Sequence, residues 1–221
     1  MSNLQLASSI LVDPRPAFAA LDKSPRFWFP LLVPVAVQVA MTFWYFGVVD
    51  YPWLLDEVFG PAASQQANTP SKSLMMWSTV AALALGVPLL RVLEAAYFWL
   101  AGRLTNIQRP FRQWLALTCW SSFPYVLTVF LMVIPLVSHN AAKTTQDGLS
   151  LLSLNELVFH LPRDSRWHTL MSSITVLHPW LWWLTVLGVR VWSGRSWRFS
   201  MGLALLPMLV LYGAWVLLVL L

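Results

Sequence analysis

Charged side chains are scarce in this sequence. Asp, Glu, Lys and Arg make up 10% of the 221 residues, whereas a soluble domain carries about 25%. Hydrophobic residues make up 58%, and the mean hydropathy is +0.64. A soluble fold has no place for so much apolar surface, whereas a lipid bilayer does. The composition therefore predicts an integral membrane protein with one membrane domain and no sizeable soluble domain.

The residues and motifs of common catalytic and metal sites are also missing. The single cysteine, Cys119, excludes an internal disulfide and is not a metal site on its own. The sequence has no Gly-x-Ser-x-Gly, no His-Glu-x-x-His and no phosphate loop. His160, Asp164 and His168 are spaced four and four, but Pro162 interrupts a helix through them. We interpret them as polar surface residues and expect no catalytic residue, cofactor or metal.

Five apolar segments are long enough to cross a bilayer, which needs about 20 helical residues. We predict an all-α, polytopic membrane protein with five transmembrane helices in a domain over residues 27–221, at about 27–49, 74–102, 113–137, 174–192 and 201–221. The fourth span contains His178-Pro179. Either its helix kinks there, or Pro179 lies in its first turn and the span is short.

Basic residues alternate with the predicted crossings. One side would hold nine of them against two acids: Arg15, Lys23, Arg26, Arg103, Arg109, Arg112, Arg190, Arg195 and Arg198 against Asp13 and Asp22. The other side would hold four basic residues and six acidic ones: Lys72, Lys143, Arg163 and Arg166 against Asp50, Asp56, Glu57, Asp147, Glu156 and Asp164. Because Lys and Arg concentrate in cytoplasmic loops, we expect a cytoplasmic N-terminus and an outer C-terminus.

The segments outside the spans are polar or short. Residues 1–26 lack the features of a signal peptide, and Asp13-Pro14 divides their apolar pattern in two. We expect a cytoplasmic, amphipathic interfacial segment, with Phe18 anchored in the inner leaflet. Residues 50–73 contain Pro52, Pro61 and Pro70 and are expected to form a loop. A short amphipathic helix is expected at residues 149–161, on the outer surface.

Arg91 and Glu94 lie inside the second predicted span, between the middle of the membrane and its inner edge. A charge at membrane depth is costly and normally faces protein or a water-filled cavity. Their spacing of three places both on one helix face, where they can pair. They would form either a structural ion pair or a binding site for a lipid headgroup or solute.

The remaining candidate residues lie in two short basic loops. Their arginines flank hydrophobic spans and form no stripe, so the pI of about 9.8 does not indicate nucleic-acid binding. Anionic lipids of the cytoplasmic leaflet attract such clusters, and we expect lipid headgroups to contact Arg103, Arg109, Arg112, Arg190, Arg195 and Arg198.

Several apolar motifs resemble the Yip-domain family, whose name refers to interaction with Rab-type GTPases in eukaryotes. The N-terminal motif consists of an apolar pair, then Pro-Arg, then Ala-Phe. A proline-containing entry to the first span follows it. A glycine loop follows the second span, and the fourth begins with proline. These motifs are Ile10 to Phe18, Ser24-Pro25-Arg26, Trp28-Phe29-Pro30, Gly102 to Pro124, and His178 to Gly188.

The resemblance implies five spans, no known catalytic activity and a role in membrane organisation or trafficking. A bacterial member would lack Rab partners. We therefore expect a non-enzymatic protein of the bacterial inner membrane that organises lipids or a partner membrane protein, including a second copy of itself. The alternative is a small transporter or lipid translocator that uses Arg91 and Glu94. An intramembrane enzyme ranks third.

Overall fold

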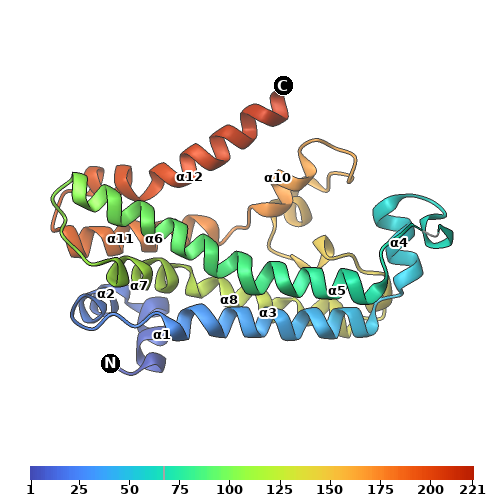
Figure 1. Cartoon of the computed structure of the whole chain (residues 1–221), viewed down its shortest axis with the longest axis horizontal. Coiled ribbons are helices and arrows are strands. Elements are labelled where there is room, and N and C mark those ends of the chain that lie inside the picture. Colours follow the sequence, from blue (N-terminus) through green and yellow to red (C-terminus); the bar gives the residue numbers. More distant parts are fainter. Residues whose placement is uncertain (67) are drawn as a thin grey trace.

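The computed structural model describes residues 1–66 and 68–221, and its regular elements in these residues are all helices (Figure 1). Long helices lie side by side along the longest axis of the molecule. The two N-terminal helices, α1 (Asn3–Val12) and α2 (Pro14–Lys23), lie at one end. The helix α4 (Tyr51–Phe59) lies at the other. The chain is an all-α polytopic membrane protein, as predicted.

Four helical segments are long and apolar enough to cross a membrane. The first is α3 (Trp28–Val48). The second is continuous from residue 72 to 104 and joins α5 (Lys72–Ala81), the π-helical turn η2 (Ala82–Gly86) and α6 (Val87–Leu104). The third joins α7 (Phe111–Ser122), the 3-10 turn η3 (Phe123–Tyr125), α8 (Val126–Leu131) and α9 (Val133–Val137). The fourth is α12 (Trp197–Leu220).

The predicted fourth span is shorter than these. Its helix, α11, runs from His178 to Ser193, has 16 residues, and carries Pro179 in its first turn. Of the two alternatives, the short helix is therefore observed. At about 1.5 Å per residue, α11 is about 24 Å long and falls short of a hydrocarbon core of about 30 Å. Five crossings therefore remain a prediction.

Proline explains the irregularity of the second span. Pro88 has no N–H to donate, and its ring would collide with the carbonyl four residues earlier in a regular α-helix. The turn η2, directly before it, is wider than an α-helical turn. The helical segment from residue 72 to 104 therefore stays continuous through Pro88.

The expected loop at residues 50–73 is wrong in its first part, which forms α4. Pro52 indicates a helix break in the sequence, but it lies in the first turn, where its missing N–H has no consequence. Asp50 caps this helix by accepting a hydrogen bond from the Trp53 backbone N–H. The short turn η1 (Ala63–Gln65) follows. The Tyr51 phenol donates to the Pro70 carbonyl, and desolvation raises the pKa of this phenol.

The amphipathic helix expected at residues 149–161 is also wrong. That stretch contains the end of the 3-10 turn η5 (Asp147–Leu149) and a five-residue π-helical turn, η6 (Asn155–Phe159). Between them, residues 152–154 pair their backbone with residues 174–176 in an isolated antiparallel bridge. This pairing uses backbone groups that a helix would need. The turn η4 (Ala141–Lys143) precedes this segment, and α10 (His168–Ser173) follows it.

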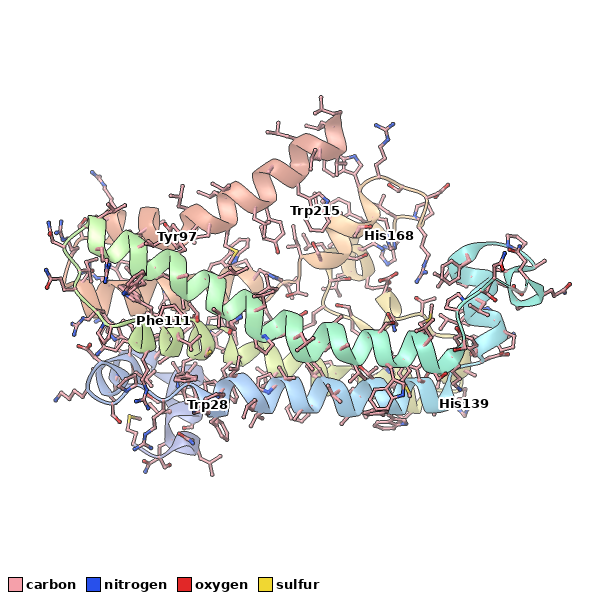
Figure 2. All side chains as sticks on the ribbon, viewed as in Figure 1. Trp28, Tyr97, Phe111, His139, His168 and Trp215 are labelled. Atoms are coloured by element: carbon pink, nitrogen blue, oxygen red, sulfur yellow. The ribbon has the colours of Figure 1, made fainter. Side chains whose placement is uncertain are left out.

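Buried apolar residues form two clusters. The larger one joins α1, α2, α6, α7, α11 and the first half of α12. The smaller one joins α3, α4, α8, α9 and the turn η5. The outward faces of α5, α6 and α12 remain apolar and exposed, as lipid contact requires: Leu85, Leu89, Leu209 and Leu218 are each more than half exposed. Figure 2 shows Phe111 and His139 at opposite ends of this bundle.

Candidate functional site

The N-terminal helices cover one end of the bundle. The break between them at Asp13-Pro14 is as predicted. The lipid anchor expected at Phe18 is wrong, because this side chain is 0% exposed and packs against α7 and α11. An apolar helix face has the same sequence pattern whether protein or lipid covers it. Here Leu6, Ile10, Phe18 and Leu21 all face protein.

Two tryptophans fasten this N-terminal segment to the bundle. The indole N–H of Trp192, on α11, donates to the Phe18 carbonyl at 2.8 Å. The indole N–H of Trp120, on α7, donates to the Arg26 carbonyl at 2.6 Å. Buried indoles normally find such a partner for their N–H group. The segment is therefore part of the folded core.

Arg109 is one of the predicted headgroup ligands, but its partners are protein groups. Its guanidinium is 2.7 Å from the Asp22 carboxylate and donates to the Trp192 carbonyl at 3.1 Å. The side-chain amide of Gln113 donates to the Asp22 carbonyl. Arg109 thus joins the loop between α6 and α7 to α2 and α11.

Four other arginines of this end lie over aromatic rings. Arg103 lies 3.9 Å from the centre of the Trp99 ring, Arg190 lies 4.6 Å from Trp197, Arg195 lies 5.0 Å from Phe199, and Arg112 lies 6.0 Å from Phe27. These contacts orient the guanidinium groups and leave most of their donors free. Arg198 is exposed on the first turn of α12.

Three arginines surround a pocket of about 200 Å³ at this end, which we call the arginine pocket. Its charged lining consists of Arg15 from α2, Arg190 from the last turn of α11 and Arg195 from the turn between α11 and α12. Arg195 also donates to the Thr105 carbonyl, and Arg190 to the Arg195 carbonyl, so the turn is held in place. None of the three belongs to an ion pair among the described residues. The sequence pattern included Arg190 and Arg195 but missed Arg15, which folding of α2 brings to them.

Arg91 and Glu94 form the predicted pair. Their side chains are 2.7 Å apart, and Arg91 is 25% exposed while Glu94 is 11% exposed. The Thr118 hydroxyl of α7 lies 3.4 Å from the Arg91 carbonyl. Neither residue lines the arginine pocket or the cavity described next. The pair is formed as predicted, and its role, as a structural ion pair or as a binding site, stays a prediction.

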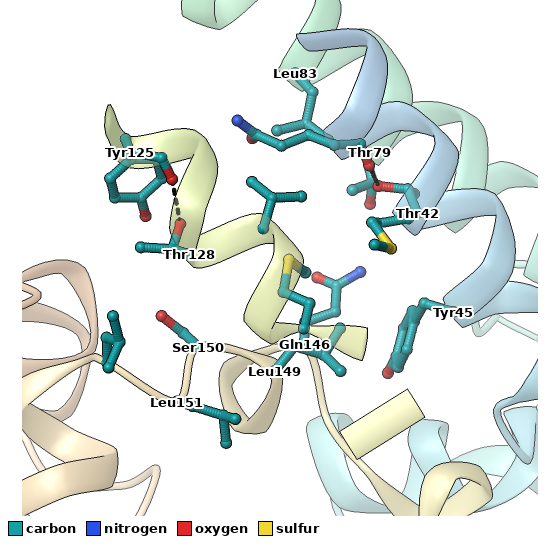
Figure 3. Close-up of a pocket in the computed structure, with 15 residues that line it drawn as sticks. Thr42, Tyr45, Thr79, Leu83, Tyr125, Thr128, Gln146, Leu149, Ser150 and Leu151 are labelled. Carbon is teal, nitrogen blue, oxygen red and sulfur yellow. Dashed lines mark hydrogen bonds between the residues drawn. The ribbon is translucent and has the colours of Figure 1, made fainter. Parts of the chain in front are cut away.

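A cavity of about 210 Å³ lies in the other half of the bundle. We call it the outer cavity, after the side that the charge pattern predicts for this half. Figure 3 shows its walls: α3 supplies Thr42 and Tyr45, the second span supplies Thr79 and Leu83, and the third supplies Tyr125 and Thr128. Residues 146–152 close it on one side. An ion pair between Arg163 and Asp147, 2.8 Å apart, braces that segment. No sequence motif indicated this cavity, because four separate segments meet there.

The histidine cluster does not form a metal site in the part of the chain that the structure describes, where no group of three potential ligands meets. His160 and Asp164 are exposed, as expected of surface residues, but His168 is buried. His160 has a positive φ of 48° and ends η6, so no regular helix continues from it to His168.

A model of the Yip1 domain matches residues 8–218, which is nearly the whole chain. No curated protein and no solved structure matches the chain.

Proposed function

The chain belongs to the Yip1-domain family, a membrane-associated family that is not a known enzyme family, and from this premise we propose that it is a non-enzymatic organiser of membrane lipids. Its lipid partners would be anionic, and its basic end would be the site of contact. We further propose that it resides in a bacterial inner membrane, with the N-terminus cytoplasmic and the C-terminus periplasmic. The nine basic residues predicted for one side support this orientation.

The arginine pocket is the observation that carries the proposal. Its three guanidinium groups have no carboxylate partner among the described residues, and they converge at one end of the bundle. A lipid phosphate is an acceptor of matching charge and size for such a cluster. Each Arg near an anionic surface contributes about 1 kcal/mol of attraction, so the cluster favours anionic over zwitterionic lipid.

Lipid retention by the purified protein tests this proposal. The protein is mixed with phosphatidylglycerol or phosphatidylcholine in detergent, and bound lipid is counted by native mass spectrometry. Wild type should prefer phosphatidylglycerol, and added salt should weaken the preference. Arg15→Gln should weaken phosphatidylglycerol binding about fivefold, the equivalent of about 1 kcal/mol.

Arg166→Gln is the matched control. Arg166 is exposed in the segment between η6 and α10, and it is one of the four basic residues predicted for the opposite side of the membrane. It should bind as wild type does. Equal retention of the two lipids by wild type would refute the proposal. An equal loss in Arg15→Gln and Arg166→Gln would show that net charge, rather than the pocket, determines binding.

A structural partner is the second candidate, because exposed apolar faces on α5, α6 and α12 can contact another membrane protein or a second copy of this chain as well as lipid. The transport alternative has less support, since the outer cavity does not include Arg91 or Glu94.

A further inference from the structure

Helix irregularities converge on the outer cavity. Leu83 belongs to the π-helical turn η2 of the second span, and Tyr125 to the 3-10 turn η3 of the third. Met132 lies at the junction between α8 and α9. All three line the cavity. In membrane proteins, interrupted helices are tolerated where they face protein or a cavity, and π-helical turns are frequent at functional sites.

The cavity lining carries no charged side chain. Its fifteen residues include the hydrogen-bonding residues Gln38, Thr42, Tyr45, Thr79, Tyr125, Thr128, Gln146 and Ser150. A charged occupant would have no counter-ion there and would lose its hydration, which is costly in a site of low dielectric. The occupant is therefore a neutral molecule.

Three threonine hydroxyls indicate what kind of polar group the occupant has. Thr42, Thr79 and Thr128 donate their protons to carbonyls of their own helices, at 2.9, 2.9 and 2.7 Å. A hydroxyl has one proton and two acceptor sites, so each oxygen keeps acceptor capacity at the cavity. A hydroxyl-bearing occupant can donate to these oxygens, whereas an ester or an ether cannot.

The rest of the wall is apolar and adaptable. Met41, Leu83, Val129, Met132 and Leu149 line it, and methionine adjusts its shape readily to a ligand. At about 30 Å³ per molecule, 210 Å³ would hold about seven waters. A wall this apolar binds carbon better than it binds seven waters. The volume suits the head and the first carbons of a lipid, with the remaining chain extending between the helices.

We propose that the outer cavity binds a neutral, hydroxyl-bearing lipid, with its hydroxyl groups donating to Thr42, Thr79 and Thr128. This site is separate from the arginine pocket in chemistry and position, and it does not depend on anionic-lipid binding. Gln38 adds an amide that can donate and accept.

Native mass spectrometry of the full chain, with three probes, tests the proposal. The probes are 1-monooleoylglycerol, glycerol and methyl oleate. The first should bind with one-to-one stoichiometry and the other two at least tenfold more weakly, because glycerol lacks the chain and methyl oleate lacks the hydroxyls. Equal binding of glycerol would indicate a site for a free polyol, and equal binding of methyl oleate a site for any chain. Either result would overturn the proposal.

Substitutions locate the site. Thr42→Val combined with Thr128→Val keeps the shape but removes two acceptors, and should weaken monooleoylglycerol binding about tenfold, at about 0.7 kcal/mol for each hydrogen bond. Met132→Trp fills the cavity and should abolish binding by excluding the lipid sterically, with all three threonine acceptors still present.

The control is Thr185→Val on α11, because Thr185 also donates to its own helix, at 3.1 Å, and lies outside the cavity lining. It should bind as wild type does. Thermal unfolding of every variant verifies its fold. Wild-type affinity in either cavity variant, or an equal loss in Thr185→Val, would refute the site.

Discussion

Gly188 offers a sharp test of the way the N-terminal helices dock. A Cβ atom at this position would lie 2.7 Å from the Leu117 Cδ1 atom and 3.0 Å from the Phe18 Cε1 atom. Both neighbours are 0% exposed, so neither side chain has free space into which it can move. Gly188→Ala should therefore push α2 away from α7 and α11. Overpacking of this kind costs about 1 to 3 kcal/mol.

Alanine also favours the helix, which offsets part of this cost by about 0.8 to 1 kcal/mol. Gly202, on α12, has nothing within 4 Å of a Cβ atom and gives the matched control. Gly202→Ala should gain only the stability that comes from the higher helix propensity of alanine. The difference between the two variants isolates the overpacking cost, so Gly188→Ala should be the less stable by about 1 to 3 kcal/mol.

Thermal unfolding in detergent measures this difference. At about 2 to 4 °C per kcal/mol for a chain of this size, the Tm of Gly188→Ala should lie about 2 to 12 °C below that of Gly202→Ala. Cleavage by trypsin after Lys23 should accelerate in Gly188→Ala alone. Equal Tm values and equal cleavage would refute the docking of Phe18 against Gly188.

Two further predictions concern the charged residues. Arg91→Leu and Glu94→Leu should each lower thermal stability more than the double substitution does, because a single change leaves one charge uncompensated at a cost of about 2.5 to 3.5 kcal/mol; single variants as stable as wild type would exclude a buried pair. Cysteine at Lys143 should react with an impermeant reagent added outside intact cells, and cysteine at Arg26, Arg109 or Arg195 should not; labelling of Arg109→Cys would reverse the orientation.

The sequence predicts the long spans well, because their apolar length is a local property. The observed α3 and α12 begin and end within four residues of their expected bounds. Tertiary partners are not local, and the errors arise there. Phe18 has the same apolar neighbours in sequence whether lipid or α11 covers it. Pro52 is compatible with both a loop and a helical first turn, and only Asp50 as the cap distinguishes them.

The candidate sites divide in the same way. The Arg91–Glu94 pair lies three residues apart on one helix, so it could be predicted from spacing. The arginine pocket forms because α2 packs beside the end of α11. This packing places Arg15 near Arg190 and Arg195, about 175 positions further along the chain. The outer cavity needs four segments and two irregular turns. No single-segment pattern contains that information.

Photocrosslinking of lipid is the most direct test of lipid recognition at the basic end. Phosphatidylglycerol and phosphatidylcholine, each with a photoreactive group near the phosphate, are added separately to the reconstituted protein. Cross-linked peptides are then located by mass spectrometry. The arginine pocket predicts phosphatidylglycerol cross-links at α2 and at the turn between α11 and α12, reduced in Arg15→Gln and weak with phosphatidylcholine. The same peptides labelled equally by both lipids, or labels confined to the exposed faces of α5, α6 and α12, would contradict it.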